Sequence, residues 1–241
     1  MVIFLICIFL FPRHITGYGQ KMRSDTIRNQ IIDYIITATE ASSLDSVHIS
    51  KLVKELNINR NTFYYHFDSK LDVALYVFRV DLAKTLTERV PQDYLIEAEL
   101  PLRPRPKSLP YYMHREIGAR LLDNSDFLKA LVYCVTARPL FYRKLFTVNE
   151  PEMKTRIFEL FRPAVEDDVR FVLSGRYMPR ETFDFLVSQQ LENLYQLPCY
   201  HLANPSSSEC LLDDAVNPFW NYPYEMLMTE LQEHPIKKPR G

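Results

Sequence analysis

Glycine is scarce in this 241-residue chain, and its five glycines never cluster. No glycine-rich loop is available to cradle a phosphate, which weighs against a nucleotide-using enzyme. The sequence also offers no nucleophile–base pairing and no metal-ligand spacing. We therefore expect that the protein is no enzyme and uses no cofactor.

Cysteine is sparse as well, and no CxxC pair occurs. The four widely separated cysteines argue against a disulfide framework and fit a reduced, cytoplasmic setting. Cys199, His201 and Cys210 could be imagined as metal ligands. Their spacing matches no zinc pattern, so ordinary buried or loop cysteines are the favoured reading, and we expect no metal site.

A strong charge of either sign is missing, since the formal net charge is −1 at pH 7. The molecule as a whole is therefore no basic nucleic-acid binder, and any DNA contact must come from a local patch. Between Met22 and Leu86 the basic and acidic residues are equal in number. We expect modest non-specific affinity for DNA, and specific binding that depends on dimerisation.

Hydrophobic runs long enough to span a bilayer are also lacking. The apolar stretch 2–11 is too short for a membrane span, and it lacks the charged start and cleavage site of a secretory signal. Met22 stands just before the first well-formed helix signal. We interpret residues 1–21 as an extension or a mis-assigned start; a membrane tether is the weaker alternative, and we expect no membrane partner.

Helix signals dominate residues 22–90. Ser24 or Asp25 can cap a first helix whose apolar residues share one face, and Ser46 can cap a second. Ser69 begins a capping box that starts a longer helix, which Pro91 ends. These signals predict a compact helical domain over 22–90.

A polar turn and a short helix lie at the centre of this domain. Asn57 tolerates the left-handed geometry of a turn, and Asn59 is a good N-cap. Ile58 and Phe63 can form a hydrophobic staple across the helix start. With Phe63 and Phe67 pointing inward, 3.6 residues per turn leaves the opposite face of the helix to solvent.

The order of helix, turn and short helix is that of a helix-turn-helix, whose second helix enters the major groove of DNA. Residues 24–87 resemble the DNA-binding domain of TetR-type transcriptional regulators. The resemblance lies in the order of the signals and in residues 59–70, Asn-Arg-Asn-Thr-Phe-Tyr-Tyr-His-Phe-Asp-Ser-Lys. That run is similar to the family's pattern of a threonine, an apolar residue, a tyrosine, two variable positions, a phenylalanine and a serine-lysine pair. The chain departs from the family in lacking glycine at Ala41-Ser42 and at Asn57.

The resemblance implies roles for the matching positions. Arg60, Asn61 and Tyr65 would read base edges, since arginine suits guanine and asparagine suits adenine. Phosphate oxygens would be bound by a second group of residues: Thr62, Tyr64, His66, Lys70 and Lys51. Ordinary half-buried aromatics and a satisfied surface histidine are the alternative reading of Tyr64, Tyr65 and His66.

The rest of the chain carries no evident strand pattern. Residues 91–110 are rich in proline and are expected to form a linker, and residues 111–241 to form a helical regulatory and dimerisation domain. Helices are predicted at 111–123, from Ser125, from Pro151 to a break or kink at Pro163, from there to Leu173, at 179–197 before Pro198, and at 224–234. The predicted fold class is all-α.

Aromatic residues are plentiful in the body, and helical bundles bind ligands between helices. Met113, His114, Tyr133 and Phe158 are candidate pocket residues, although ordinary core positions are the alternative for each. By position, the resemblance assigns the dimer interface to the helices near 179–197 and 223–234.

The resemblance implies a DNA-binding transcriptional regulator: a ligand-responsive repressor that acts as a homodimer on a palindromic operator. Its partners would be double-stranded DNA, a second copy of the chain and an unknown small-molecule effector. The alternative is a co-activator or adaptor of the same fold that binds a protein partner through the same face.

Overall fold

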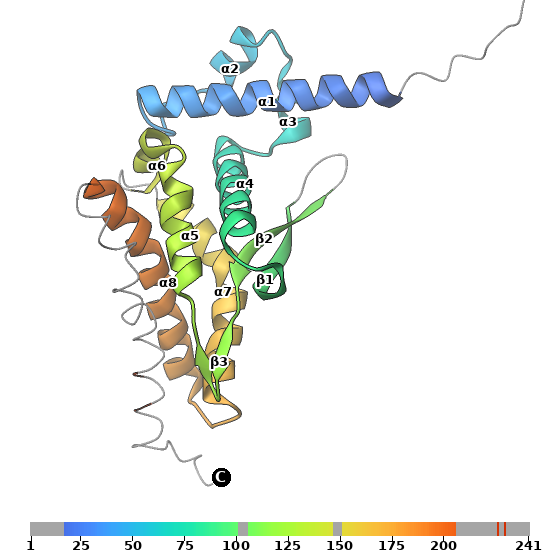
Figure 1. Ribbon diagram of the computed structural model, residues 1–241. Helices are drawn as coiled ribbons and strands as arrows, with labels where there is room; N and C mark the ends of the chain where they lie inside the picture. The colour runs from blue at the N-terminus through green and yellow to red at the C-terminus, as the bar shows by residue number, and fades with distance from the viewer. Residues whose placement is uncertain (1–16, 101–105, 147–150, 206–225, 227–228, 230–241) are drawn as a thin grey trace, which may run out of the picture.

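The computed structural model describes residues 17–100, 106–146 and 151–205, together with Met226 and Thr229. The N-terminal region consists of α1 (Gly17–Ala41), α2 (Ile49–Glu55) and α3 (Arg60–His66), followed by the long α4 (Lys70–Arg89). Figure 1 shows α1 lying across one end of the molecule, with α2 and α3 beside it. Helix α4 runs from that layer into the body.

Helix α1 begins earlier than predicted. Neither Ser24 nor Asp25 caps it, because the helix already starts at Gly17 and passes through both residues. Asp25 instead forms an ion pair with Arg28, one turn further on, at 2.6 Å. The expected apolar face is confirmed by Ile31 and Ile35, which are fully buried. Residues 1–16 lie outside the described residues, and the predicted boundary at Met22 falls inside this helix.

The predicted cap of α2 is also wrong. His48 occupies the N-cap position, while Ser46 lies in the preceding turn, where its hydroxyl donates to the carbonyl of Ser43 at 2.7 Å. A serine can satisfy backbone groups in a turn as well as at a helix start, so the local sequence alone does not choose between them.

The all-α prediction is wrong, because two small antiparallel sheets follow α4. After the 3-10 turn η1 (Gln92–Tyr94), strand β1 (Leu95–Leu100) pairs with β2 (Lys107–Met113). Strand β3 (Glu116–Gly118) then pairs with β4 (Leu121–Leu122). These strands occupy much of the predicted 91–110 linker and replace the predicted helix at 111–123.

Prolines and aromatics explain this outcome. Proline cannot donate to a helix, and Pro110 sits in β2 opposite Glu97, beside a bulge between Ile96 and Glu97, where a missing donor is tolerated. Tyr111, Tyr112 and Met113 are buried in succession, so both faces of this strand are covered. A strand that is covered on both faces lacks the alternation of apolar and polar residues from which a strand is usually predicted.

A buried arginine fastens the first sheet to α4. Arg79 is only 4% exposed, and its Nη2 donates to the carbonyls of Ala98 on β1, at 3.1 Å, and Leu109 on β2, at 3.3 Å. Its guanidinium also lies 5.5 Å from the ring centre of Tyr111. These contacts compensate the burial of the charge and fix the sheet against the helix.

The body is completed by α5 (Ser125–Thr136), α6 (Pro139–Phe146), α7 (Pro151–Leu173) and α8 (Arg180–Ala203). The predicted start at Pro151 is confirmed, but Pro163 does not end α7 and Pro198 does not end α8. Each proline removes one backbone donor, and the buried apolar residues around it keep the helix continuous. The helix predicted at 224–234 lies outside the described residues, apart from Met226 and Thr229.

Helix α4 joins the two parts through a shared core. Its residues Val73, Ala74, Phe78 and Leu82 are almost fully buried. The Phe78 ring meets aromatic rings of α6 and α7, with its centre 6.3 Å from that of Phe161. Helix α4 therefore shares one hydrophobic core with both the N-terminal helices and the body.

Candidate nucleic-acid interface

The turn before α3 has the predicted geometry. Asn57 adopts a left-handed backbone with φ of 51°, which asparagine tolerates better than most residues. Asn59 is the N-cap of α3: its side-chain oxygen accepts from the backbone N–H of Thr62 at 2.7 Å and from the Thr62 hydroxyl at 2.9 Å. Both predictions from sequence are confirmed, and together they define where the helix begins.

Two phenylalanines hold α3 in place. Phe63 is fully buried and Phe67 is 6% exposed, as predicted, and their ring centres lie 6.5 Å apart. Ile58 packs against the same core from the turn, in the position expected of a staple. Burial on this face leaves the other face of α3 free to meet a partner.

The outward face carries the three residues predicted to read bases. Arg60 and Asn61 are exposed, and Tyr65 is 47% exposed. Tyr64 is exposed beside them, and the Arg60 guanidinium lies 5.9 Å from its ring centre. The structure thus brings the predicted base readers together on one surface.

The predicted phosphate contacts divide into two groups. Tyr64 and Lys51 are exposed, and Nζ of Lys51 on α2 lies 3.8 Å from the carboxylate of Glu55. Thr62 is half-buried, and its hydroxyl is bound to Asn59. The exposed side chains of Tyr64 and Lys51 are accessible to a phosphate from solvent.

His66 lies apart from the exposed group. It is 8% exposed, its Nδ1 has no hydrogen-bond partner among the described residues, and its ring packs edge-on against Tyr65. Burial lowers the pKa of the His66 imidazole, and the nearby charge of Arg28 lowers it further. The burial of His66 does not fit the predicted phosphate contact, and it also differs from the alternative of a satisfied surface histidine.

Lys70 is engaged within the domain. Its Nζ donates to the carbonyl of Asp45 at 2.7 Å and approaches the carbonyl of Val47 at 3.4 Å. It thereby ties the start of α4 to the turn before α2. The N-cap half of the predicted capping box is confirmed, since the Ser69 hydroxyl accepts from the backbone N–H of Asp72. The Asp72 carboxylate accepts from the Ser69 hydroxyl.

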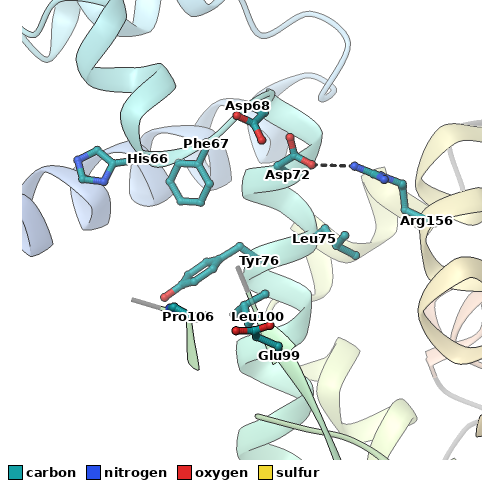
Figure 2. Close-up of a pocket in the computed structure, with 10 residues that line it drawn as sticks. All are labelled: His66, Phe67, Asp68, Asp72, Leu75, Tyr76, Glu99, Leu100, Pro106 and Arg156. Atoms are coloured by element: carbon teal, nitrogen blue, oxygen red, sulfur yellow. Dashed lines mark hydrogen bonds and ion pairs between the residues drawn. The ribbon is translucent and has the colours of Figure 1, made fainter. Parts of the chain in front are cut away.

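A cavity of about 460 Å³ lies behind this region, where α3 meets α4 (Figure 2). Its described walls come from the end of α3, the first turns of α4, strand β1, Pro106 just before β2, and helix α7. The cavity could not be predicted from the sequence, because one of its walls is a β-sheet and the sequence shows no strand pattern there.

The four predicted pocket residues are engaged with different partners. Met113 is buried in β2, and Tyr133 on α5 lies under the Arg89 guanidinium, 3.4 Å from ring centre to Cζ. Phe158 on α7 faces the ring of Tyr195, and His114 belongs to a polar network. The cavity at the α3–α4 junction is lined by none of them.

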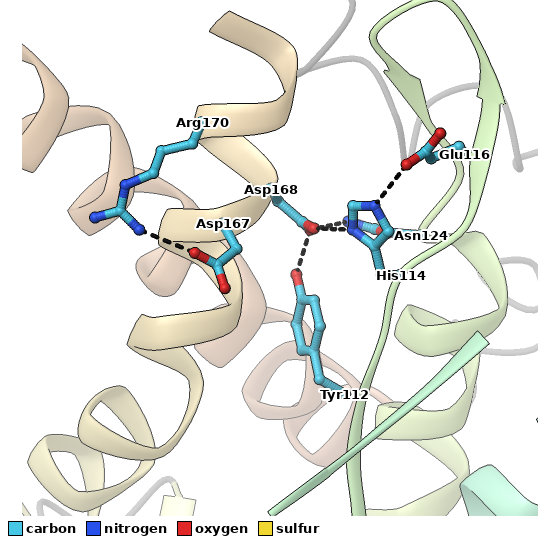
Figure 3. A network of polar contacts seen from close by, with 7 residues as sticks. All are labelled: Tyr112, His114, Glu116, Asn124, Asp167, Asp168 and Arg170. Atoms are coloured by element: carbon cyan, nitrogen blue, oxygen red, sulfur yellow. Dashed lines mark hydrogen bonds and ion pairs between the residues drawn. The ribbon is translucent and has the colours of Figure 1, made fainter. Parts of the chain in front are cut away.

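That network centres on a fully buried carboxylate, Asp168 of α7 (Figure 3). It accepts from the hydroxyl of Tyr112 at 2.9 Å and from the amide of Asn124 at 3.2 Å, and it lies 2.7 Å from Nδ1 of His114. The hydrogen bond to Asp168 is the main reason that the pKa of His114 is raised, and Glu116, 3.4 Å from Nε2, adds to it.

Sequence reasoning missed Asp168, although a signal existed. The residue lies within the apolar stripe formed by Val165, Val169 and Val172 on α7. An acidic side chain in such a stripe must be paired when buried, so it marks a buried polar contact.

No protein-family profile and no solved structure matches the chain. One known protein does: HTH-type transcriptional regulator SAB2452 from Staphylococcus aureus (strain bovine RF122 / ET3-1) is 28% identical over 137 residues, which span 52% of this chain and 67% of that protein. This similarity supports a transcription regulator. Within the described residues, none of the helices has both the length and the apolar character needed to cross a bilayer.

Proposed function

We propose that this protein is a DNA-binding repressor of the TetR type, which acts as a homodimer and responds to a small molecule. One observation carries the proposal: α3 is capped by Asn59, anchored by Phe63 and Phe67, and exposes Arg60, Asn61 and Tyr65 together. The name of the Staphylococcus aureus relative, an HTH-type transcriptional regulator, supports the DNA-binding regulator part of this proposal. Under this proposal the chain binds DNA and catalyses no reaction.

The chemistry of the exposed face suits base readout. An α-helix with its side chains is about 10–12 Å in diameter, and the major groove is about 12 Å wide, so a helix such as α3 can enter it. Arg60 can form two hydrogen bonds with guanine, and Asn61 can do the same with adenine. Tyr64 and Lys51 would hold phosphates on either side and set the register.

The absence of net positive charge on the DNA-binding region favours binding to DNA as a dimer. A neutral domain gains little from counterion release, so one copy would hold DNA poorly, and two linked copies bind together. Helix α8, at the predicted interface, exposes the large apolar side chains of Phe185 and Tyr200. A symmetric pair would bind half-sites about 34–36 Å apart, or a multiple of that distance.

A second candidate is an adaptor that binds a protein through the α3 face. The observation that favours it is the exposed pair Tyr64 and Tyr65 on a region without net positive charge. Aromatic side chains are typical of protein interfaces. Steep salt dependence of DNA binding would reject this candidate.

The proposal is tested by selecting bound duplexes from a random pool with the full chain, and then measuring variants on the selected and scrambled duplexes. We expect Arg60→Ala and Asn61→Ala each to weaken binding to the selected duplex by about 1–3 kcal/mol, with a smaller effect on the scrambled one. Lys51→Ala should weaken both alike. Lys84→Ala, which removes an exposed lysine of α4 outside the α3 face, is the control and should change neither.

Failure to enrich any duplex would reject the DNA-binding proposal. Equal losses on both duplexes for Arg60→Ala would reject its role in base reading and leave only a backbone contact.

A further inference from the structure

His114 lies directly after β2, and its ring connects two further elements of the body (Figure 3). On one side, Nδ1 lies 2.7 Å from a carboxylate oxygen of Asp168, which is fully buried on α7. On the other side, Nε2 lies 3.4 Å from the carboxylate of Glu116, the first residue of β3. The ring therefore bridges a buried carboxylate of α7 and an exposed carboxylate of the β3–β4 hairpin.

The protonation state of the ring decides how many of these contacts it can make. A neutral imidazole has one N–H donor, whereas an imidazolium has two. A neutral ring can thus donate to one of the two carboxylates, and the shorter contact, to Asp168, is the one it keeps. The charged ring donates to Asp168 and Glu116 at once, in two charge-assisted hydrogen bonds.

Uncharged groups surround the rest of this contact. The ring of Phe171 on α7 packs edge-on against His114, with ring centres 5.4 Å apart. The hydroxyl of Tyr112 and the side-chain amide of Asn124 donate to Asp168, which fixes the carboxylate in place. The buried end of the bridge is therefore rigid, and the exposed end, at Glu116, is the one that can move.

Charged side chains close to the bridge are paired with other residues. Arg115 binds the carboxylates of Asp123 and Asp126, with its Nη1 2.7 Å from Asp126. Asp167 pairs with Arg170 at 2.9 Å, on the side of α7 that faces away from His114 (Figure 3). None of these pairs contains a histidine, so a change of pH near neutrality does not break them.

Strand β3 has little else to hold it against the body. All three of its residues are exposed, and its pairing with β4 is short and irregular. A segment with little buried surface opens locally at a low cost in free energy. The loss of one ion pair is therefore enough to change how often the hairpin opens.

We propose that His114 is a pH-sensitive latch, whose charged ring holds β3 to α7 through Glu116 and Asp168 and which opens as pH rises. The hydrogen bond to Asp168 is the main reason that the pKa of His114 is raised, so the latch stays closed above the ordinary histidine pKa of about 6.5. Its stabilisation is complete below that value and is lost as pH rises through the folded pKa. Deprotonation keeps the bond to Asp168 and releases Glu116, so the hairpin loosens while the body stays folded.

Amide hydrogen exchange of the full chain tests the latch. The protection of residues 116–122, corrected for the intrinsic exchange rate at each pH, should fall about two- to fivefold between pH 6 and pH 9, the size expected for a partly exposed ion pair. Protection that stays constant over this range would overturn the proposal.

Variants separate the latch from a general loss of stability. Glu116→Gln should give the hairpin at pH 6 the low protection that the wild type shows at pH 9, with little further fall. His114→Asn keeps a neutral donor for Asp168 and should also remove the pH dependence. Glu97→Gln, which changes an exposed carboxylate of the other sheet, is the matched control and should keep the wild-type profile. A wild-type profile in Glu116→Gln would overturn the proposal.

The titration of the ring itself gives a readout that a merely structural role would not change. The NMR signal of the His114 ring, assigned by its absence in His114→Asn, should titrate at a lower pH in Glu116→Gln, because one of the two carboxylates that favour the charged ring is gone. Glu97→Gln should leave this midpoint unchanged. An unchanged midpoint in Glu116→Gln would show that Glu116 does not hold the charged ring, and the latch would be rejected.

Discussion

The two parts of this molecule satisfy their polar groups in different ways. Around α3, the two capping side chains bind backbone groups three residues away: Asn59 binds Thr62, and Ser69 binds Asp72. In the body, buried polar groups join distant elements. Asp168 of α7 meets Tyr112 of β2, 56 residues away in the chain.

A second buried carboxylate follows the pattern of the body. Asp81 of α4 accepts from the Tyr142 hydroxyl of α6 at 2.7 Å, and the Nε of Arg138 lies 3.0 Å away. Local caps set where a helix starts, whereas long-range contacts set how elements pack. Loss of a local cap should therefore mainly change the conformation of α3, whereas loss of a long-range contact should mainly lower the stability of the whole chain.

Asp168→Ala should have the largest effect. Removing the carboxylate leaves Tyr112, His114 and Asn124 without their shared buried partner, so we expect a loss of about 3 kcal/mol or more in the free energy of unfolding. Urea denaturation followed by circular dichroism measures it. Asp167→Ala removes the neighbouring exposed carboxylate and should change stability by less than about 0.5 kcal/mol. Similar losses of stability in the two variants would contradict the idea that buried long-range contacts stabilise the body.

Asn59→Ala should have a smaller effect on stability and a clear one on DNA. Loss of an N-cap typically costs about 1 kcal/mol, and here it also frees the start of the helix that carries Arg60 and Asn61. Denaturation and binding to the selected duplex are the two measurements. Asn59→Ser keeps a capping oxygen and should behave like the wild type. If Asn59→Ser loses as much stability and DNA affinity as Asn59→Ala, the loss of the N-cap does not explain the effect.

The two histidines should respond to pH in opposite directions. His114 has a raised pKa in the folded state, so its contribution to stability is full below its unfolded pKa of about 6.5 and is lost as pH rises through the folded value. Urea denaturation between pH 6 and pH 9, comparing wild type with His114→Asn, isolates this contribution. A difference between the two proteins that stays constant with pH would contradict it.

His66 has a lowered pKa because burial disfavours its charged form, so the sign reverses. Its contribution is full above the unfolded pKa of about 6.5 and is lost as pH falls through the folded value. His66→Gln, a neutral side chain of similar polarity, should reduce the loss of stability on acidification, measured between pH 7 and pH 5. Greater loss in the variant than in the wild type would show that His66 is not buried as a neutral ring.

Most of the DNA-facing region could be predicted because its determinants are local. The left-handed Asn57, the cap at Asn59 and the inward Phe63 and Phe67 all follow from residue type and helical spacing. The burial of His66 could not be predicted, since it depends on the packing of α3 against the rest of the domain. The roles of Arg60, Asn61 and Tyr65 on DNA stay predictions.

The sheets escaped prediction for a physical reason. A strand is stabilised by its partner, and β2 pairs with β1 across a gap of several residues that includes prolines. Its buried face continues through Tyr111, Tyr112 and Met113 because α4 and α7 pack around it. The same apolar run read alone resembles one turn of a buried helix.

By itself, the sequence determined the helix-turn-helix: where α3 starts, which side of it is buried and which residues face outward. It also determined that α7 starts at Pro151, because a proline fits the first turn of a helix without loss. Tertiary structure alone decided that β1 pairs with β2, that Asp168 gathers three partners, and that a cavity opens behind α3. Each of these features depends on contacts between segments that are far apart in the chain. Such contacts produce no periodic pattern in the sequence of either segment.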